Sequence, residues 1–524
     1  MRLRSLLLLL LLLGLLTFRR YGYTWDEPLY YGYAEALPYA YQPWNWLRPD
    51  FDLEKAYGPS PADHKTRGPA YLLLSYPFAA LLQSLGLPRD EAWHLVNFLA
   101  FLLGLVLFHR LARRWFSPFV SLSITALFAT QPLLWEHAFI NPKDIPFLFA
   151  FLGAILFGLE MVDSWAQGVP SWRRTLLASF FLGYAIVLRV IAPLAAVLIL
   201  ACAWLRRARP PLRHLFAYLL GAALLTLALW PYLWTDPIGH FLEVFFLMTN
   251  NIASMKVLFN GNLYPATALP RRYLPFLILI TTTETTWLLA ILGLILTLGP
   301  ILHRGRQQLR LTRDLWRARP TPGRGLCEAG IVAAWFLIPL IYVILWRPPM
   351  YDNHRHFFFI LPPLFYLAGL GLESLLQRLN FPAAWRGLLL TLILLPGLLN
   401  IAVLYPYEYT YYNSLIGGPA GAFGRFETDY WLTCYKESLQ TLNAQLTGPI
   451  RLFVWREPLI AMAYAGPNVQ VHSLREEPQA IHRGDYLLVN TRAFEDRGIY
   501  PLAPEVLRVQ RAGATYCIVR RLGK

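Results

Sequence analysis

Long apolar runs separated by short arginine-rich segments are the feature that most constrains the fold of this chain. The runs are about 16 to 25 residues long, the length that an α-helix needs to cross the hydrocarbon core of a bilayer. Hydrophobic residues make up 56% of the 524 positions and charged residues 15%, which is too little charge for the surface of a soluble protein of this size. We therefore predict an all-α polytopic membrane protein.

The basic clusters lie between apolar runs, where the positive-inside rule places cytoplasmic loops. They are His109–Arg114, Arg206–His214, Arg304–Arg319 and Gln377–Arg386. This placement accounts for the net charge of +16 and argues against nucleic acid as a partner. All clusters fall on one side if segment 69–86 lies in the membrane interface or re-enters instead of crossing. About eleven spans then follow, near residues 4–20, 92–110, 118–134, 145–162, 175–189, 191–205, 214–233, 284–302, 327–346, 357–376 and 387–404.

The composition changes after the last apolar run, which predicts two domains: a transmembrane domain over 1–404, with a first external loop at 21–91 that holds interfacial helices, and a small extracytoplasmic α/β domain over 405–524. A helix is expected from Cys434 to Leu446. Strands are expected at 450–455, 469–473, 486–491, 506–510 and 516–520, with the last two in a hairpin. Cys434 and Cys517 both lie in this domain, so a disulfide between them is an open question.

A pair of adjacent carboxylates, Asp26 and Glu27, follows the first apolar run. Acidic side chains are costly at lipid depth, so this pair either stays in water or serves a function. One interpretation is a helix start, with Pro28 in the first turn. The other is a functional site, because nearby aromatic side chains could form a wall for sugar stacking. They are Trp25, Tyr30, Tyr31 and Tyr33.

A second acidic turn is predicted at Trp135–Asp144 on the same face, and it contains Lys143 and Asp144. Its plain interpretation is an Asn-Pro turn in which Asp144 begins the next helix. Basic residues also occur on this face, at Arg67, Arg271, Arg355 and His356. Each is either an interfacial anchor or a ligand for a lipid phosphate, because Arg offers a bidentate fork to phosphate oxygens.

The order of these motifs resembles the GT-C membrane glycosyltransferases, and within them the family 39 group that includes protein O-mannosyltransferases and the aminoarabinose transferase of lipid A. The stretches TWDEPLYYGYAEAL, INPKDIPF and RHFFFILPPL, which begin at residues 24, 140 and 355, carry the resemblance. The run from Tyr411 to Asn443 is similar to a segment of bacterial members of the group. The resemblance covers most of the chain.

The resemblance implies an inverting glycosyltransferase that moves a sugar from a polyprenyl-phosphate-linked donor to a lipid, glycan or protein acceptor at the outer face of the bacterial inner membrane. Asp26 matches the catalytic acid position, which implies a general base. Glu27 is expected to orient it or to bind acceptor, and Asp144 matches the second acidic position.

The resemblance also implies how the donor phosphate is bound. Arg355 matches the family's late basic position, where it would stabilise the leaving phosphate. The other candidate phosphate ligands are His356, Lys143, Arg271 and Arg67. No cofactor is expected, and no cluster of His and Asp in the sequence demands a divalent metal.

Two alternatives remain open. The first is a transporter or flippase of a lipid-linked sugar, a class that often places charges in the middle of spans and shows inverted repeats. Glu160, Arg189, Glu284 and Glu373 lie in or beside the predicted spans, although no repeat is visible. The second is a structural subunit without catalytic activity, against which the acidic pair, the second acid and the external arginine argue mildly.

Overall fold

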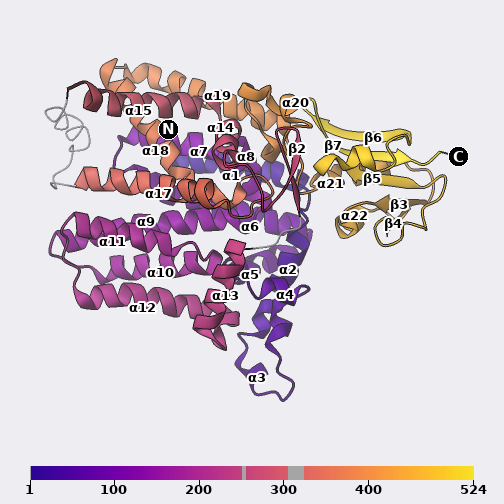
Figure 1. Ribbon diagram of the computed structural model, residues 1–524, viewed down its shortest axis with the longest axis horizontal. Helices are drawn as coiled ribbons and strands as arrows, with labels where there is room; N and C mark the ends of the chain where they lie inside the picture. The colour runs from indigo at the N-terminus through magenta and orange to yellow at the C-terminus, as the bar shows by residue number, and fades with distance from the viewer. Residues whose placement is uncertain (1, 251–254, 305–323, 524) are drawn as a thin grey trace.

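The structure, a computed structural model, describes residues 2–250, 255–304 and 324–523. Helices run side by side along one direction, and the C-terminal sheet lies beyond one end of the bundle (Figure 1). The bundle comprises α1 (Leu3–Thr17), α6 (Arg89–Ala112), α7 (Pro118–Ala129), α8 (Pro132–Ile140), α9 (Asp144–Ala166), α10 (Trp172–Leu188), α11 (Pro193–Leu205), α12 (Leu212–Leu229), α15 (Glu284–Arg304), α17 (Arg324–Trp346), α18 (Pro362–Arg378) and α19 (Arg386–Leu404).

Each of the eleven ranges predicted to cross the membrane overlaps a helix of the bundle, and the range 118–134 overlaps both α7 and α8. Within the described residues, five helices are long and apolar enough to span a membrane, and seven if each of two bent helix pairs is one span. The bent pairs are α7 with α8, at 66°, and α14 (Tyr273–Thr281) with α15, at 112°. Because α1, α10 and α18 have only 15, 17 and 17 residues, the number of eleven spans stays a prediction.

The arginine-rich loops pair with acids at the ends of neighbouring helices. Arg110 contacts Glu160 at 2.7 Å, and Arg114 and Arg206 contact Asp163 at 3.0 and 2.7 Å. These pairs join the loops after α6 and α11 to the C-terminal end of α9, so both loops lie at the same end of the bundle. The predicted cluster Arg304–Arg319 lies outside the described residues except for its first residue.

The predicted external loop 21–91 folds into short helices at the opposite end of the bundle (Figure 1). They are α2 (Glu27–Ala36), α3 (Pro43–Trp46), α4 (Pro61–His64) and α5 (Ala70–Ser84). One side of α5 exposes Leu74, Phe78 and Leu81, while Tyr71 and Ala79 are buried. An apolar exposed face suits a helix that lies against lipid, and the interfacial position of α5 stays a prediction.

Three local expectations differ from the structure. Residues 135–140, predicted as part of a turn, continue α8, because Pro132 begins a new helix after the break at Thr130 and Gln131. The predicted span 357–376 starts inside a 3₁₀ helix, η6 (Arg355–Ile360), which precedes α18. A hairpin of β1 (Lys256–Phe259) and β2 (Asn262–Pro265) was not predicted; it follows α13 (Pro237–Asn250).

The C-terminal segment forms the predicted small α/β unit. Its sheet has the order β4-β3-β5-β7-β6, with β3 parallel to β4 and β5, and β7 antiparallel to β5 and β6. The elements are α20 (Gly418–Ala422), α21 (Cys434–Gln445), β3 (Ile450–Val454), α22 (Pro458–Tyr464), β4 (Val469–Ser473), β5 (Tyr486–Asn490), α23 (Glu495–Gly498), β6 (Glu505–Arg511) and β7 (Ala514–Arg521). Ala512 and Gly513, both with positive φ, close the predicted hairpin.

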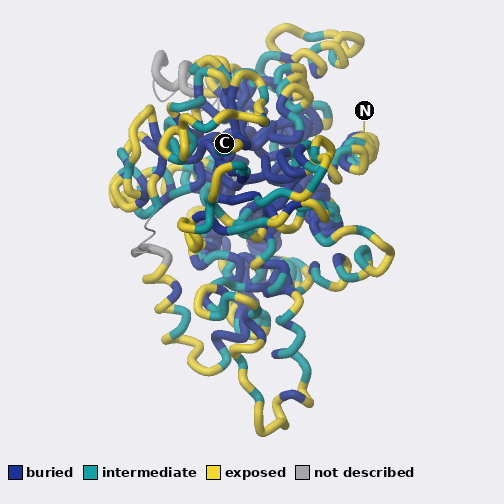
Figure 2. The backbone as a smooth tube through the Cα atoms, turned by 90° about the vertical axis from the view of Figure 1, so that its right-hand side faces the viewer, coloured by how far each residue is buried: buried dark blue, intermediate teal, exposed yellow. Residues whose placement is uncertain are grey.

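The two faces of the sheet are covered differently, as the alternation of side chains along a strand requires. Leu452, Val454 and Leu488 join the large core that continues into the helical bundle. Phe453 and Leu487 belong to a small separate cluster on the other face. Figure 2 shows buried positions gathered in the centre of the molecule, so the C-terminal unit packs on the bundle through a continuous apolar core.

Candidate active site

Asp26 lies at the start of α2, with Pro28 in the first turn as the helix-start interpretation predicts. The Asp26 side chain nevertheless makes no hydrogen bond that caps the helix. It is 32% exposed, and one of its oxygens lies 3.6 Å from the Arg355 guanidinium. The helix-start interpretation is therefore confirmed for the backbone, while the functional interpretation of the carboxylate, which faces Arg355, stays a prediction.

Glu27 has a different environment from its neighbour. Its side chain is fully buried. It accepts hydrogen bonds from the Thr24 amide at 2.7 Å and from the Tyr31 hydroxyl, and lies 3.0 Å from His94 Nε2. These contacts hold the segment that carries Asp26, and they leave Glu27 no exposed surface for an acceptor. Of its two predicted roles, the geometry fits the orienting one.

The predicted wall of aromatic residues does not form. Tyr31 stacks on Trp93 with ring centroids 4.5 Å apart, and Tyr33 stacks on His64 at 4.8 Å. Both tyrosines are fully buried, so they belong to the core. Trp25, which is half-buried, keeps an exposed surface beside Asp26.

The acidic turn at Asp144 positions a buried carboxylate. The Asn141 side-chain oxygen accepts hydrogen bonds from the backbone amides of Lys143 and Asp144, at 3.1 and 2.8 Å, which fixes the start of α9. The Asp144 carboxylate accepts hydrogen bonds from Arg189 and, at 3.1 Å, from Arg355. Asp144 is only 1% exposed, so its observed role is to hold two guanidinium groups in place.

Arg355 is the hub of the site. Besides Asp26 and Asp144, it contacts Asp352 at 3.0 Å, and its guanidinium lies 4.8 Å from the centre of the Trp431 ring. The side chain is 3% exposed. A buried guanidinium surrounded by three carboxylates is held in one orientation, since Asp144 contacts one terminal nitrogen and Asp352 and Asp26 contact the other.

A cavity of about 330 Å³ adjoins this hub, and it has two kinds of wall. The cationic part contains Arg67, Lys143, Arg189 and His356. The apolar part comes from α10, α11, α13 and α17 and from the segments that follow α10 and α17, and includes Val187, Leu188, Val190, Ile191, Leu194, Val244, Phe245, Ile338, Pro339 and Phe357. An anionic group attached to a hydrocarbon chain would match both parts.

The cationic wall carries unfavourable repulsion. Burial lowers the pKa of Lys143 well below its ordinary value, and the charges of Arg67 and Arg189 lower it further. Burial, with Arg355 and Arg189 nearby, lowers the pKa of His356 in the same way. Lys143 Nζ donates a hydrogen bond to the Tyr30 hydroxyl at 2.6 Å, and this acceptor carries no compensating charge. An anion in the cavity would relieve this repulsion.

The structure brings together most of the predicted site residues, with one exception. Asp26, Asp144, Lys143, Arg67, Arg355 and His356 gather around the hub and the cavity. Arg271 is exposed and does not line the cavity. Its role as a phosphate ligand stays a prediction, and it does not share this cavity with the other candidates.

Three charged residues of the site were not predicted as members of it. Arg189 follows the last residue of α10. The sequence showed that it lies in or beside a predicted span, but it did not identify Asp144 as its partner. Asp352 lies in the turn before η6, and Arg492 belongs to the C-terminal unit. Their partners are distant in sequence, so no local pattern identifies them.

The charges noted at span ends also have structural partners. Glu160 pairs with Arg110, Glu373 accepts a hydrogen bond from the Ser117 amide at 2.9 Å, and Glu284 accepts one from the Ser414 amide at 2.7 Å. Together with the pair of Arg189 and Asp144, these contacts give a structural role to each of the four charged residues that favoured a transporter.

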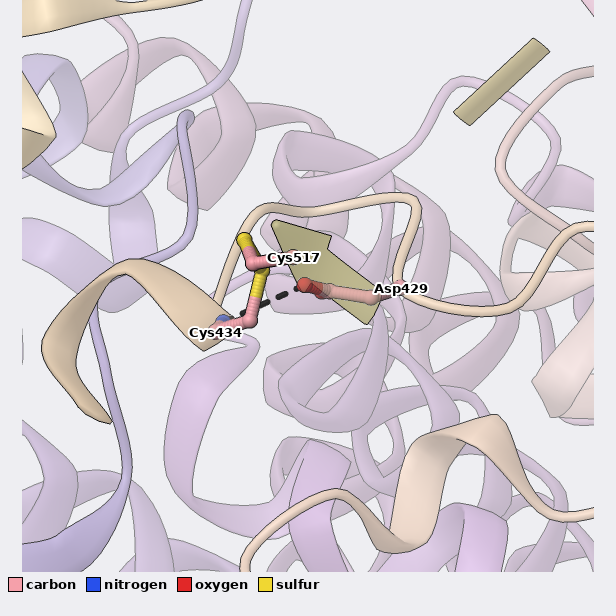
Figure 3. Close-up of side chains that lie close together, drawn as sticks. All are labelled: Asp429, Cys434 and Cys517. Carbon is pink, nitrogen blue, oxygen red and sulfur yellow. Dashed lines mark hydrogen bonds between the residues drawn. A yellow bond between two sulfur atoms is a disulfide. The ribbon is translucent and has the colours of Figure 1, made fainter. Parts of the chain in front are cut away.

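One cluster has the spacing of metal ligands, formed by Asp429, Cys434 and Cys517 (Figure 3). Its two sulfur atoms are joined in a disulfide, so they are not available as thiolate ligands. Asp429 accepts hydrogen bonds from the backbone amides of Thr433 and Cys434, at 3.0 and 3.1 Å. The disulfide left open by the sequence is thus present, and this cluster is structural.

No protein-family model and no curated protein sequence matches this chain. Among solved structures, it is similar to the oligosaccharyltransferase AglB from Archaeoglobus fulgidus in complex with an inhibitory peptide and a dolichol-phosphate. That match has 11% identity and a TM-score of 0.51, and covers 98% of this chain and 74% of that one. ArnT from Cupriavidus metallidurans bound to undecaprenyl phosphate matches with 15% identity and a TM-score of 0.48, covering 99% and 97%.

The likeness to AglB extends over almost the whole chain. At this level of identity the likeness establishes the fold. The chain is a multi-pass membrane protein with the fold of the GT-C membrane glycosyltransferases.

Proposed function

We propose that the protein is an inverting glycosyltransferase that uses a polyprenyl-phosphate-linked sugar as its donor. The observation that carries this proposal is the half-exposed Asp26 carboxylate, which lies at the Arg355 hub beside a cavity with one cationic and one apolar wall. A phosphate with a long hydrocarbon chain needs both walls, and the sugar attached to it would then lie between the phosphate and Asp26.

In the proposed reaction, Asp26 accepts the proton of an acceptor hydroxyl as that oxygen forms a bond to the anomeric carbon of the donor sugar. The bond between this carbon and the donor phosphate oxygen breaks, and its electron pair leaves with the polyprenyl phosphate. A positioned general base of this kind contributes about 10²- to 10⁴-fold in rate. Attack on the face opposite the phosphate inverts the anomeric configuration.

The leaving phosphate gains negative charge during this step, and the cations at the cavity would stabilise it. The cavity wall carries the charged side chains of Arg67 and Arg189, and a bound phosphate would favour the charged forms of Lys143 and His356. Arg355 contacts Asp26 and Asp144. Preorganised cations stabilise developing charge without having to reorganise during the reaction. We therefore expect transfer to continue in the presence of a metal chelator.

The fold supports the same donor class. AglB, whose fold this chain resembles, was solved with a dolichol-phosphate, which is a polyprenyl-type phosphate. We further propose that the protein lies in the inner membrane of a bacterium, with the C-terminal unit on the extracytoplasmic side. A glycolipid, a surface glycan and a protein remain candidates for the acceptor.

The proposal is tested with purified protein in detergent, a polyprenyl-phosphate sugar with a radiolabelled sugar, and an extract of envelope glycolipids and glycans. Label is expected to move to the extract with wild-type protein and not with D26N. Wild-type rates in folded D26N would contradict the assignment of the base. Movement of the labelled lipid between the leaflets of a vesicle, without formation of a glycosidic bond, would instead favour a flippase.

A further inference from the structure

Arg492 extends from the C-terminal unit into the candidate active site. It follows β5 and is the first residue of a short 3₁₀ helix, η10 (Arg492–Phe494). The other two residues of this helix, Ala493 and Phe494, have positive φ. Its own amide donates a hydrogen bond to the Asn490 side chain at 2.6 Å. Residues other than glycine keep a left-handed backbone conformation where surrounding contacts impose it. The backbone here is therefore shaped to hold this side chain.

The guanidinium of Arg492 is almost completely buried and joins three segments. It contacts Asp352 at 2.7 Å and the Tyr430 carbonyl oxygen at 2.5 Å. Its centre lies 4.4 Å from the middle of the Trp25 ring, which directly precedes Asp26. The turn before η6, the segment after α20 and the first external loop are thus connected by one side chain.

Asp352 transmits this contact to the hub. It is fully buried, and accepts hydrogen bonds from Arg492, from Arg355 at 3.0 Å and from the Trp431 indole N–H at 3.1 Å. Arg492 and Arg355 therefore share one carboxylate. Because Arg492 neutralises Asp352, part of the attraction between Arg355 and Asp352 is offset, and Arg355 stays available to Asp144 and Asp26.

The contact between Arg355 and Asp26 is the most sensitive to this balance. Its distance is 3.6 Å, compared with 3.1 Å to Asp144 and 3.0 Å to Asp352. Without the charge of Arg492, Asp352 would attract Arg355 more strongly, and the longest of the three contacts would be lost first. Trp25 would lose its cation partner at the same time.

We propose that Arg492 is a positioning residue, by which the C-terminal unit sets the place of Asp26 relative to Arg355. This inference rests on the proposed glycosyltransferase function. It assigns the C-terminal unit a part in the reaction itself, whereas its fold alone would suggest only a cap over the site.

The first test compares R492Q, which removes the charge, with R492K, which keeps the charge and loses the planar fork. We expect kcat to fall by about 10²-fold in R492Q, the size of effect that a displacement of about 1 Å at a reacting group produces. The kcat of R492K is expected to lie between those of wild type and R492Q, with little change in the KM for the donor lipid. The matched control is R508Q, whose side chain pairs with Glu505 on the surface of the sheet. Wild-type kcat in R492Q would overturn the inference.

The second test separates positioning from a general loss of structure by combining R492Q with D352N. If Arg492 acts by neutralising Asp352, removal of that carboxylate restores the balance around Arg355. The double variant is then expected to be several-fold more active than R492Q, because the effects of two contacting residues in a double-mutant cycle are not additive. A double variant at or below the activity of R492Q, with unchanged unfolding temperature, would contradict the inference.

A third measurement does not require transfer activity. In a background without the two buried free cysteines, Cys202 and Cys327, the variant D26C is labelled with a thiol reagent in detergent. The labelling rate is expected to change when R492Q is added and to stay constant with R508Q. Equal rates would overturn the inference. A changed labelling rate, together with no sugar transfer by the protein that retains Asp26, would refute the glycosyltransferase proposal and leave the positioning role intact.

Discussion

The buried carboxylate of Asp144 gives the sharpest prediction about the stability of the site. In D144N, Arg189 and Arg355 lose the carboxylate charge that each of them now contacts. Arg355 retains Asp352 and Asp26, but the described residues show no other carboxylate paired with Arg189. Removal of one partner from a buried ion pair costs about 3 to 5 kcal/mol. We therefore expect the free energy of unfolding to fall by about this amount.

The assay is thermal or denaturant unfolding in detergent, followed by intrinsic fluorescence. The matched control is E160Q, which breaks the pair with Arg110, an arginine with 51% side-chain exposure. An exposed pair contributes about 0 to 1 kcal/mol, so E160Q is expected to unfold close to wild type. If D144N is as stable as E160Q, then Asp144 does not hold the two arginines as the structure indicates.

Three further predictions follow from single contacts. K143Q should weaken the binding of polyprenyl phosphate by about tenfold, the size of one charge-assisted hydrogen bond, as measured by retention of a labelled lipid; unchanged binding would remove Lys143 from the phosphate site. Burial raises the pKa of Glu408 from its ordinary value of 4.5 to about 8, so the folded protein retains a proton that the unfolded chain loses between these values. Stability should fall as pH rises through this window, by about 1.4 kcal/mol per unit from Glu408, and a slope in E408Q as steep as in wild type would contradict this assignment. C434A opens a disulfide that joins residues 83 positions apart, which should cost about 4 kcal/mol on the loop-entropy scale; wild-type unfolding in C434A would show that the bond adds little.

The arrangement of the helices could be predicted because it depends on patterns that are local in sequence. Apolar length identified the ranges that form the helices of the bundle, and the basic loops predicted that Asp26, Asp144 and Arg355 share one face. The strands of the C-terminal unit were found for a similar reason, since the apolar run along Tyr486–Asn490 and the turn at Ala512 are short-range signals. These signals need no knowledge of which segments meet in space.

The remainder depends on contacts between distant segments. Tyr31 and Tyr33 were expected to face a sugar, but Trp93 and His64 cover them. Arg492 reaches an acid 140 positions earlier in the chain, and its local sequence shows only an arginine after a strand. Sequence patterns thus indicated which residues could react, and the folded chain shows which residues hold them in place.

The central claim is that Asp26 acts as the base in sugar transfer from a polyprenyl-phosphate donor. The most direct measurement is mass spectrometry of envelope lipids and glycans from cells that produce wild-type protein or D26N at equal levels. The account predicts one sugar-sized mass addition that is present with wild type and absent with D26N. The same addition at equal abundance in both strains would contradict it.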